Sequence, residues 1–200
     1  MATTQFDSAN ITAAILAGGQ GRRLGSCDKG LELLAGRPLV THAIAALRPQ
    51  VQKLLICINR NNAQYATFAV ICTDGAAGFL GPLAGIAAAL AVCDTKWLLT
   101  APVDCPQPPA DLARRLHTVA HDAQAHVAVA HDGERRQPLF ALYRRELANS
   151  ATEALAHDLP VWRWQDECGA VETDFSDQPK AFLNLNTVED FRYWESTHAR

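Results

Sequence analysis

The chain has 200 residues, of which 48% are apolar and 20% are charged, and this composition excludes an intrinsically disordered protein. The length fits one domain with a single well-buried core. The formal net charge is −3, so the chain lacks the basic excess by which many proteins bind nucleic acid. A phosphorylated substrate would therefore need a local cluster of positive charge.

The start of the chain, the cysteines and the longest uncharged run all favour a cytoplasmic protein without a membrane segment. Residues 1–10 lack a basic stretch followed by an apolar one, so we expect no secretory signal. The six cysteines form no C-x-x-C pair, which favours reduced thiols over a zinc site. Residues 76–93 carry no charge, but glycines and a proline interrupt the run near its start. We therefore expect a loop and a short buried helix there, not a membrane span.

Apolar runs alternate with helical patterns through the first 120 residues. We expect strands at residues 11–16, 53–59, 68–72 and 97–100, and helices at residues 38–47, 85–93 and 111–121. This alternation indicates a parallel sheet that is covered by helices on both faces.

The second half is less regular. Residues 126–130 and 139–143 are expected to form strands, and residues 146–157 and 187–195 to form helices. Since no linker or repeat divides the chain, residues 1–200 are expected to form a single α/β domain with a mostly parallel central sheet.

A glycine-rich segment with three basic residues follows the first expected strand. It reads AGGQGRRLGSCDK over residues 17–29, and Gly18 and Gly19 would let backbone amides approach a phosphate. Arg22, Arg23 and Lys29 supply the local positive charge. The segment matches neither the P-loop nor the dinucleotide-binding pattern. A surface loop with solvated basic residues is the alternative interpretation.

The same segment carries a family resemblance. The pattern L-A-G-G-x-x-x-R-[ML]-G-x-x-D-K-G-L, at residues 16–31, resembles the signature loop of the molybdenum cofactor guanylyltransferases. Four further motifs follow in the family's order: G-P-L-A-G at 81–85, P-x-D-x-P at 102–106, Gln-Pro at 137–138 and F-x-N-x-N-T at 182–187. The resemblance implies a Rossmann-like three-layer sandwich, with a nucleotide-binding half over residues 11–120 and an acceptor-binding half over residues 121–200.

The resemblance also implies a reaction and its residues. The enzyme would transfer GMP from GTP to the terminal phosphate of Mo-molybdopterin and release pyrophosphate, with Mg²⁺, or Mn²⁺ in its place, bound by Asp104. The catalytic residues would be Lys29, Arg23 and Asp104, and the acceptor would contact Asn184 and Asn186. The residues implied for the nucleotide are Leu16, Ala17, Gly18, Gly19, Lys29, Cys57, Asp74, Gly81, Pro82, Leu83 and Asp104.

Several of these residues have a structural alternative. Asp104 could cap the turn before Pro106, and Asp74 could belong to an Asp-Gly turn. Cys57 occupies a position where the family usually has a nucleotide-contacting Asn, so either the backbone or Asn59 would make that contact here. Asn184 and Asn186 could equally stabilise a turn.

Other functions and partners also follow from the residues and the resemblance. A related enzyme that uses CTP or a sugar phosphate is one alternative, and a nucleotide-binding regulatory domain without turnover is another. We expect transient handover of molybdopterin between this protein and the proteins that make or receive it, and no nucleic-acid partner. Trp162 and Trp164 alternate around Arg163, and we favour packing over stacking on a substrate for them.

Overall fold

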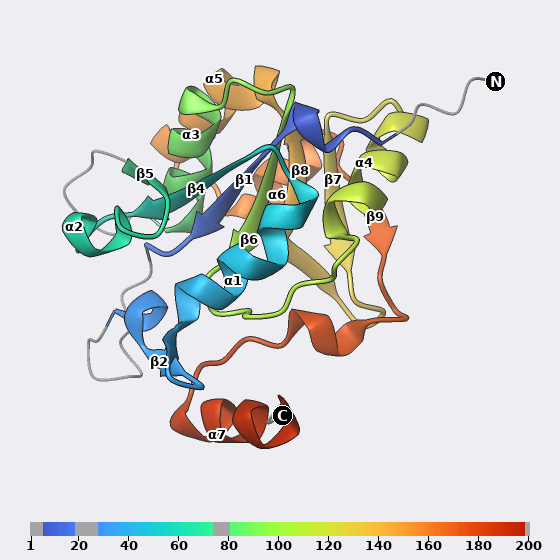
Figure 1. Ribbon diagram of the computed structural model, residues 1–200. Coiled ribbons are helices and arrows are strands. Elements are labelled where there is room, and N and C mark those ends of the chain that lie inside the picture. The colour runs from blue at the N-terminus through green and yellow to red at the C-terminus, as the bar shows by residue number, and fades with distance from the viewer. Residues whose placement is uncertain (1–5, 19–27, 74–80, 199–200) are drawn as a thin grey trace.

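The computed structural model describes residues 6–18, 28–73 and 81–198 (Figure 1). Within these ranges a seven-stranded sheet has the order β5-β4-β1-β6-β8-β7-β9, and a separate two-stranded sheet is formed by β2 and β3. Strand β8 pairs antiparallel with both β6 and β7, and the other neighbours in the large sheet pair in parallel. The strands are β1 (Ile11–Leu16), β2 (Leu33–Leu34), β3 (Arg37–Pro38), β4 (Lys53–Ile58), β5 (Val70–Thr73), β6 (Trp97–Pro102), β7 (Val127–His131), β8 (Arg136–Arg144) and β9 (Val171–Asp174).

Helices connect these strands and cover both faces of the sheet (Figure 1). The α-helices are α1 (Leu39–Leu47), α2 (Asn62–Tyr65), α3 (Pro82–Val92), α4 (Leu112–Asp122), α5 (Ala148–Ala156), α6 (Val161–Glu167) and α7 (Val188–His198). Short 3-10 helices are η1 (Ser8–Asn10), η3 (Lys29–Leu31), η4 (Arg48–Gln50), η5 (Arg145–Leu147) and η6 (Pro179–Phe182).

The side chains of strand β1 show how the sheet separates two layers of helices. All six residues of β1 are buried, because its side chains alternate between two apolar clusters. Ile11, Ala13 and Ile15 belong to the cluster that contains buried residues of α1 and α4. Ala14 and Leu16 belong to the cluster that contains residues of α3, α5 and α6. The expected α/β fold, with a mostly parallel sheet between two helical layers, is therefore confirmed.

Helix α3 begins earlier than the sequence predicts. We expected it from residue 85, but it begins at Pro82, whose fixed φ suits the first position of a helix. Gly81 precedes it with φ +78°, a conformation that L-residues rarely adopt. The helix is buried along most of its length, as expected for residues 85–93. No helix in the described part of the chain is long and apolar enough to cross a bilayer.

The last helix lies apart from the sheet (Figure 1). Helix α7 packs through Phe191 and Trp194 on a small cluster of three buried leucines, Leu34, Leu39 and Leu185. This cluster joins α7 to the β2–β3 hairpin and to α1. Helix α7 is thereby attached to the β2–β3 hairpin, which follows Lys29 closely in the chain.

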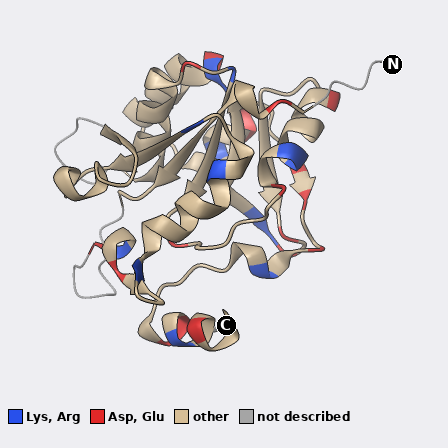
Figure 2. Ribbon diagram, viewed as in Figure 1, with Lys and Arg blue, Asp and Glu red and all other residues tan. Residues whose placement is uncertain are grey.

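The two tryptophans of α6 have different environments. Trp164 is 1% exposed and stacks on Tyr143 with ring centroids 5.2 Å apart, whereas Trp162 is 53% exposed. Trp164 therefore packs in the core, as we expected for this residue. Over the described residues, acidic and basic residues are interspersed along the ribbon (Figure 2).

Candidate active site

The carboxyl ends of three parallel strands meet at one edge of the sheet. Strand β1 lies between β4 and β6, with Leu16 in register with Cys57 on one side and Pro102 on the other. The backbone continues this pairing beyond the strands. The Ala17 N–H donates to the Cys57 carbonyl at 2.8 Å, and the Val103 N–H donates to the Leu16 carbonyl at 3.1 Å. In open α/β sheets this edge is where ligands bind.

Lys29 and Asp104 form an ion pair at this edge. Lys29 lies on η3, and its Nζ donates to Asp104 Oδ2 at 2.9 Å. The same ammonium donates to Asn186 Oδ1 at 2.8 Å. The Lys29 and Asp104 side chains are 16% and 21% exposed, so their charges are partly removed from water. The structure thus brings together three residues that the sequence placed in the site.

Asp104 accepts hydrogen bonds through both its backbone and its side chain. Its carbonyl accepts a hydrogen bond of 2.8 Å from the Leu185 N–H, which ties the segment after β6 to the segment before α7. Among the described residues its Oδ2 accepts from Lys29, whereas its buried Oδ1 has no hydrogen-bond partner. The carboxylate is therefore not used to cap its own turn within that part of the chain.

The unpartnered oxygen fits a hard divalent cation. Mg²⁺ prefers carboxylate oxygen and commonly binds one or two protein carboxylates, with water and substrate phosphates as its other ligands. The described residues contain no group of three or more His, Cys, Asp or Glu side chains that could hold a metal. Within that part of the chain, Asp104 Oδ1 would thus be a carboxylate ligand that belongs to no larger cluster of such side chains.

Leu16, Ala17 and Gly18 occupy the end of β1 and the two positions after it. The Leu16 and Ala17 side chains are buried, so these residues present backbone to the edge of the sheet. The Gly18 carbonyl accepts a hydrogen bond of 2.8 Å from Asn59 Nδ2. Asn59 follows β4 directly, and its buried Oδ1 has no partner among the described residues.

Cys57 lies beneath helix α3. It is 3% exposed and belongs to the same apolar cluster as Leu16. A Cβ at Gly85 of α3 would lie 3.5 Å from Cys57 Cβ and 3.2 Å from Leu16 Cδ2, so glycine permits this close approach. Gly81, Pro82 and Leu83 form the start of the same helix.

The two asparagines assigned to the acceptor differ in their contacts. Asn186 Oδ1 accepts a hydrogen bond from Lys29 Nζ, and the Asn186 N–H donates to Asp190 Oδ2 at 2.7 Å. Asn184 Oδ1 is buried and has no partner among the described residues. Asn184 lines a groove of about 1090 Å³ between the proline-rich segment after Cys105, η6 and α7. Gly19, Arg22, Arg23 and Asp74 lie outside the described residues.

Reasoning from sequence missed the surroundings of Asp28. Its carboxylate accepts from Tyr65 Oη at 2.5 Å and from Asn61 Nδ2 at 2.8 Å. Burial raises the pKa of the Tyr65 phenol, and the hydrogen bond to Asp28 raises that pKa further. No sequence pattern indicated these contacts, because Asn61 and Tyr65 lie 33 and 37 residues from Asp28 along the chain.

The fold and the arrangement of the strand ends define a class. The model of the MobA-like NTP transferase domain matches residues 13–171 of the chain, which is more than half of it. The protein is therefore an NTP transferase of this class.

The curated relatives narrow the class to a family. The chain is 44% identical over 184 residues to the molybdenum cofactor guanylyltransferase of Shewanella sediminis, covering 91% of this chain and 94% of that one. It is 43% identical over 183 residues to the enzyme of the same name from Shewanella putrefaciens, covering 90% and 94%. The chain belongs to the molybdenum cofactor guanylyltransferases, a family of nucleotidyltransferases.

Solved structures share the fold at low identity. Molybdopterin-guanine dinucleotide biosynthesis protein A from Archaeoglobus fulgidus superposes with a TM-score of 0.77 at 22% identity, covering 93% of this chain and 97% of that one. The 2-C-methyl-D-erythritol 4-phosphate cytidylyltransferase from Thermus thermophilus gives a TM-score of 0.68 at 15% identity, covering 96% and 98%. At these identities the likeness shows the fold alone.

Proposed function

We propose that the protein transfers GMP from GTP to the terminal phosphate of Mo-molybdopterin, forming molybdopterin guanine dinucleotide and pyrophosphate. The observation that carries this proposal is the contact of Lys29 with both Asp104 and Asn186, in a chain of the guanylyltransferase family. The contact joins a residue assigned to the nucleotide with one assigned to the acceptor. Two phosphorylated substrates would therefore meet at Lys29.

The reaction requires one bond to form and one to break. An oxygen of the acceptor phosphate attacks the α-phosphorus of GTP, and the bond from that phosphorus to the bridging oxygen of the β-phosphate breaks. Pyrophosphate leaves with the electron pair of that bond. The attacking phosphate is already an anion near neutral pH, so the reaction needs no general base. The protein has to neutralise the repulsion between the phosphates and to align them.

The charged residues around the strand ends suit this task. Lys29 supplies a positive charge that is partly shielded from water, and we assign the same role to Arg23 and Arg22 of the glycine-rich segment. Asp104 would hold Mg²⁺, which supplies positive charge to phosphate oxygens when it is bound. Because Lys29 is paired with Asp104 in this structure, it is already located next to the carboxylate that would hold the ion.

The nucleotide would lie along the carboxyl edge of β1, β4 and β6. We assign its base to the backbone of Leu16, Ala17 and Gly18 together with Asp74, and its ribose to Gly81, Pro82 and Leu83. Its triphosphate would lie over Gly18, Gly19 and Lys29. Cys57 is buried beneath α3, which favours recognition through neighbouring backbone or through Asn59 at this position.

The acceptor would bind on the other side of Lys29, near Asn186 and Asn184. The chain would then act as one domain over residues 1–200, with residues 11–120 contributing the nucleotide site and residues 121–200 the acceptor site. We also propose that the protein works in the cytoplasm and exchanges molybdopterin transiently with the proteins that supply and receive it.

Product analysis tests this function directly. Purified protein is incubated with Mo-molybdopterin and Mg²⁺ and with GTP, CTP or ATP in parallel, and the dinucleotide and pyrophosphate are quantified. The proposal expects both products to form with GTP and to disappear when Mg²⁺ is chelated. Preferential product formation with CTP would contradict guanine specificity, and no pyrophosphate with any nucleotide would contradict nucleotidyl transfer itself.

A further inference from the structure

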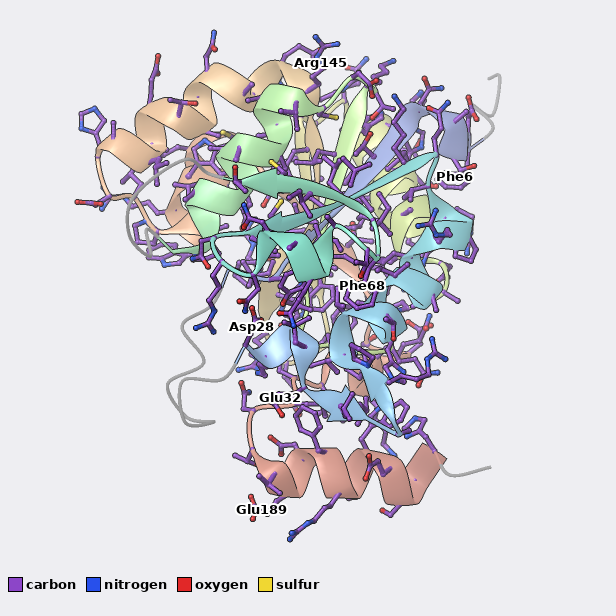
Figure 3. The ribbon with its side chains drawn as sticks, turned by 60° about the vertical axis from the view of Figure 1, so that its left-hand side comes forward. Phe6, Asp28, Glu32, Phe68, Arg145 and Glu189 are labelled. Carbon is purple, nitrogen blue, oxygen red and sulfur yellow. The ribbon has the colours of Figure 1, made fainter. Side chains whose placement is uncertain are left out.

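The carboxylate of Asp28, next to Lys29, is enclosed by side chains from the segment between β4 and β5. Tyr65 Oη donates to Asp28 Oδ1 at 2.5 Å, and Asn61 Nδ2 donates to Oδ2 at 2.8 Å. Arg60 Nε lies 3.5 Å from the same Oδ2. The Asp28 side chain is only 7% exposed. Figure 3 shows Asp28 between helix α2 and the turn that carries Lys29.

Tyr65 is a rigid partner for this carboxylate. It is fully buried at the end of α2 and belongs to the main apolar cluster, with residues of α1, β4 and β6. Its ring therefore has little freedom to move. Since burial and Asp28 raise the pKa of its phenol, the hydroxyl keeps its proton and remains a donor.

Gly30 shows how closely the two segments approach. A Cβ added at Gly30 would lie 2.3 Å from Tyr65 Oη and 3.1 Å from Val103 Cγ2. A separation of 2.3 Å between non-bonded heavy atoms is a steric clash, so any side chain here would displace Tyr65 or the backbone. The residues on both sides of Lys29 are thus fixed against Tyr65, and Gly30 also lies against the residue that precedes Asp104.

The same segment also contacts the end of β1. Asn59 Nδ2 donates to the Gly18 carbonyl at 2.8 Å. Residues 59–65 therefore contact both Gly18 and Asp28, which lie near the two ends of the glycine-rich segment.

We propose that Asp28 and Tyr65 are positioning residues, which fix the backbone of Lys29 so that its ammonium reaches the phosphates of the bound substrates. This inference rests on the proposed nucleotidyl transfer and extends it to residues that touch neither substrate. The physical reason is the length of the lysine side chain, which orients its charge only when its backbone is fixed. A displacement of about 1 Å in a positioned catalytic group can cost on the order of 100-fold in rate.

Tyr65→Phe is the test variant, because it removes the hydroxyl and keeps the ring that fills the core. Tyr143→Phe is the matched control, since Tyr143 is also fully buried and its hydroxyl accepts from Gln165 at 2.6 Å, outside the proposed site. Asn61→Gly is a milder second variant if Tyr65→Phe folds poorly. Asn61 has φ +57°, so glycine removes its amide group without adding backbone strain.

Two measurements apply to each variant. Steady-state kinetics should show kcat reduced about tenfold or more in Tyr65→Phe and less in Asn61→Gly, with KM for GTP changed by less than about threefold. Trace acetylation followed by mass spectrometry compares the reactivity of Lys29 with that of Lys53, which is 50% exposed and serves as the internal reference. Lys29 should react several-fold faster in Tyr65→Phe than in the wild type, and at the wild-type rate in Tyr143→Phe.

The labelling result separates this inference from the proposed function. A wild-type protein that makes no product would contradict nucleotidyl transfer, while faster labelling of Lys29 in Tyr65→Phe would still support its positioning by Tyr65. Unchanged labelling of Lys29 in both Tyr65→Phe and Asn61→Gly would overturn the inference, whatever the activity. Equal losses of kcat in Tyr65→Phe and Tyr143→Phe would overturn it as well, because both variants lose a buried hydrogen bond.

Discussion

Lys29 Nζ and Asn186 Oδ1 lie 2.8 Å apart although 157 residues separate them in the sequence. The hydrogen bond connects the segment after β1 to the residues that precede α7. Because the same ammonium is paired with Asp104 after β6, it links three distant parts of the chain. A change at Lys29 should therefore affect both the nucleotide and the acceptor side of the reaction.

Lys29→Ala should lower kcat on the order of 100- to 1000-fold, which is the usual cost of removing one preorganised charge from a transition state. The fold should survive, because Lys29 lies on the short helix η3 and its side chain is partly exposed. Steady-state kinetics with GTP and acceptor measures the loss, and circular dichroism checks the fold. Lys53→Ala, which removes an exposed lysine paired with Asp94, is the control and should keep wild-type turnover.

Asp104→Asn should abolish tight binding of the metal while leaving the volume of the side chain unchanged. A neutral amide is a poorer ligand for Mg²⁺ or Mn²⁺ than a carboxylate, and kcat should fall on the order of 100- to 1000-fold. Electron paramagnetic resonance of Mn²⁺ with GTP and protein measures binding independently of turnover. Wild-type turnover of Asp104→Asn in Mg²⁺ would remove the assignment of Asp104 as the metal ligand.

The positions of the main strands along the chain could be predicted from the sequence because buried parallel strands are continuous apolar runs. Strand β1 has the expected bounds, and the position of Asp104 near the end of β6 follows from the apolar run at residues 97–100. Helix α6 was missed because Trp162 and Trp164 alternate like residues of a strand. Its buried positions are Val161, Trp164 and Gln165, which is a helical spacing.

Strand β9 and the contacts of Asp28 could not be predicted from sequence patterns, for a different reason. In β9 only Thr173 is buried, so the strand carries no apolar signal. The bond from Tyr65 to Asp28 spans 37 residues and depends on α2, a helix of four residues that begins after Asn61 in a left-handed conformation. Periodicity cannot identify so short an element. Lys29 and Asp104, which the structure pairs, could thus be named from sequence motifs, whereas the side chains that contact Asp28 could not.

Gly30→Ala should destabilise the protein by about 1–3 kcal/mol, which is typical of overpacking in a filled site. The added methyl group would meet the Tyr65 hydroxyl, which cannot move away because Tyr65 is fully buried. Adding Tyr65→Phe to Gly30→Ala should recover part of this loss, since the clashing oxygen is then absent. Chemical denaturation of the two single variants and the double variant gives the coupling free energy. Strict additivity of the two effects would contradict the contact.

Asp190 should stabilise the start of α7 in a pH-dependent way. Its Oδ2 accepts hydrogen bonds of 2.7 Å from the N–H groups of Asn186 and Thr187, and Thr187 Oγ1 accepts from the Asp190 N–H at 3.2 Å. This reciprocal arrangement is a capping box. The hydrogen bond from the Asn186 N–H contributes most to lowering the pKa of Asp190 in the folded state.

A lowered pKa in the folded state makes the ionised form stabilising. The stabilisation is complete above the unfolded pKa of about 3.9 and is lost as the pH falls through the lower folded value. Asp190→Asn should therefore cost about 1 kcal/mol at neutral pH, in the range of helix-capping losses. Thermal unfolding of wild type and variant between pH 7 and pH 3 should show melting temperatures that converge below about pH 4.

The control for this effect is Glu189→Gln, which removes the same charge from the same helical turn. Glu189 is exposed and lies on the side of α7 away from the sheet (Figure 3). Its carboxylate lies in the first turn of α7, where its interaction with the helix N-terminus is worth about 0.3–1 kcal/mol at an exposed site and is screened by salt. High salt should reduce the effect of Glu189→Gln more than that of Asp190→Asn, because the Asp190 carboxylate is held by direct hydrogen bonds. Equal losses in the two variants at all salt concentrations would show that Asp190 acts through its charge alone, and the capping box would lose its support.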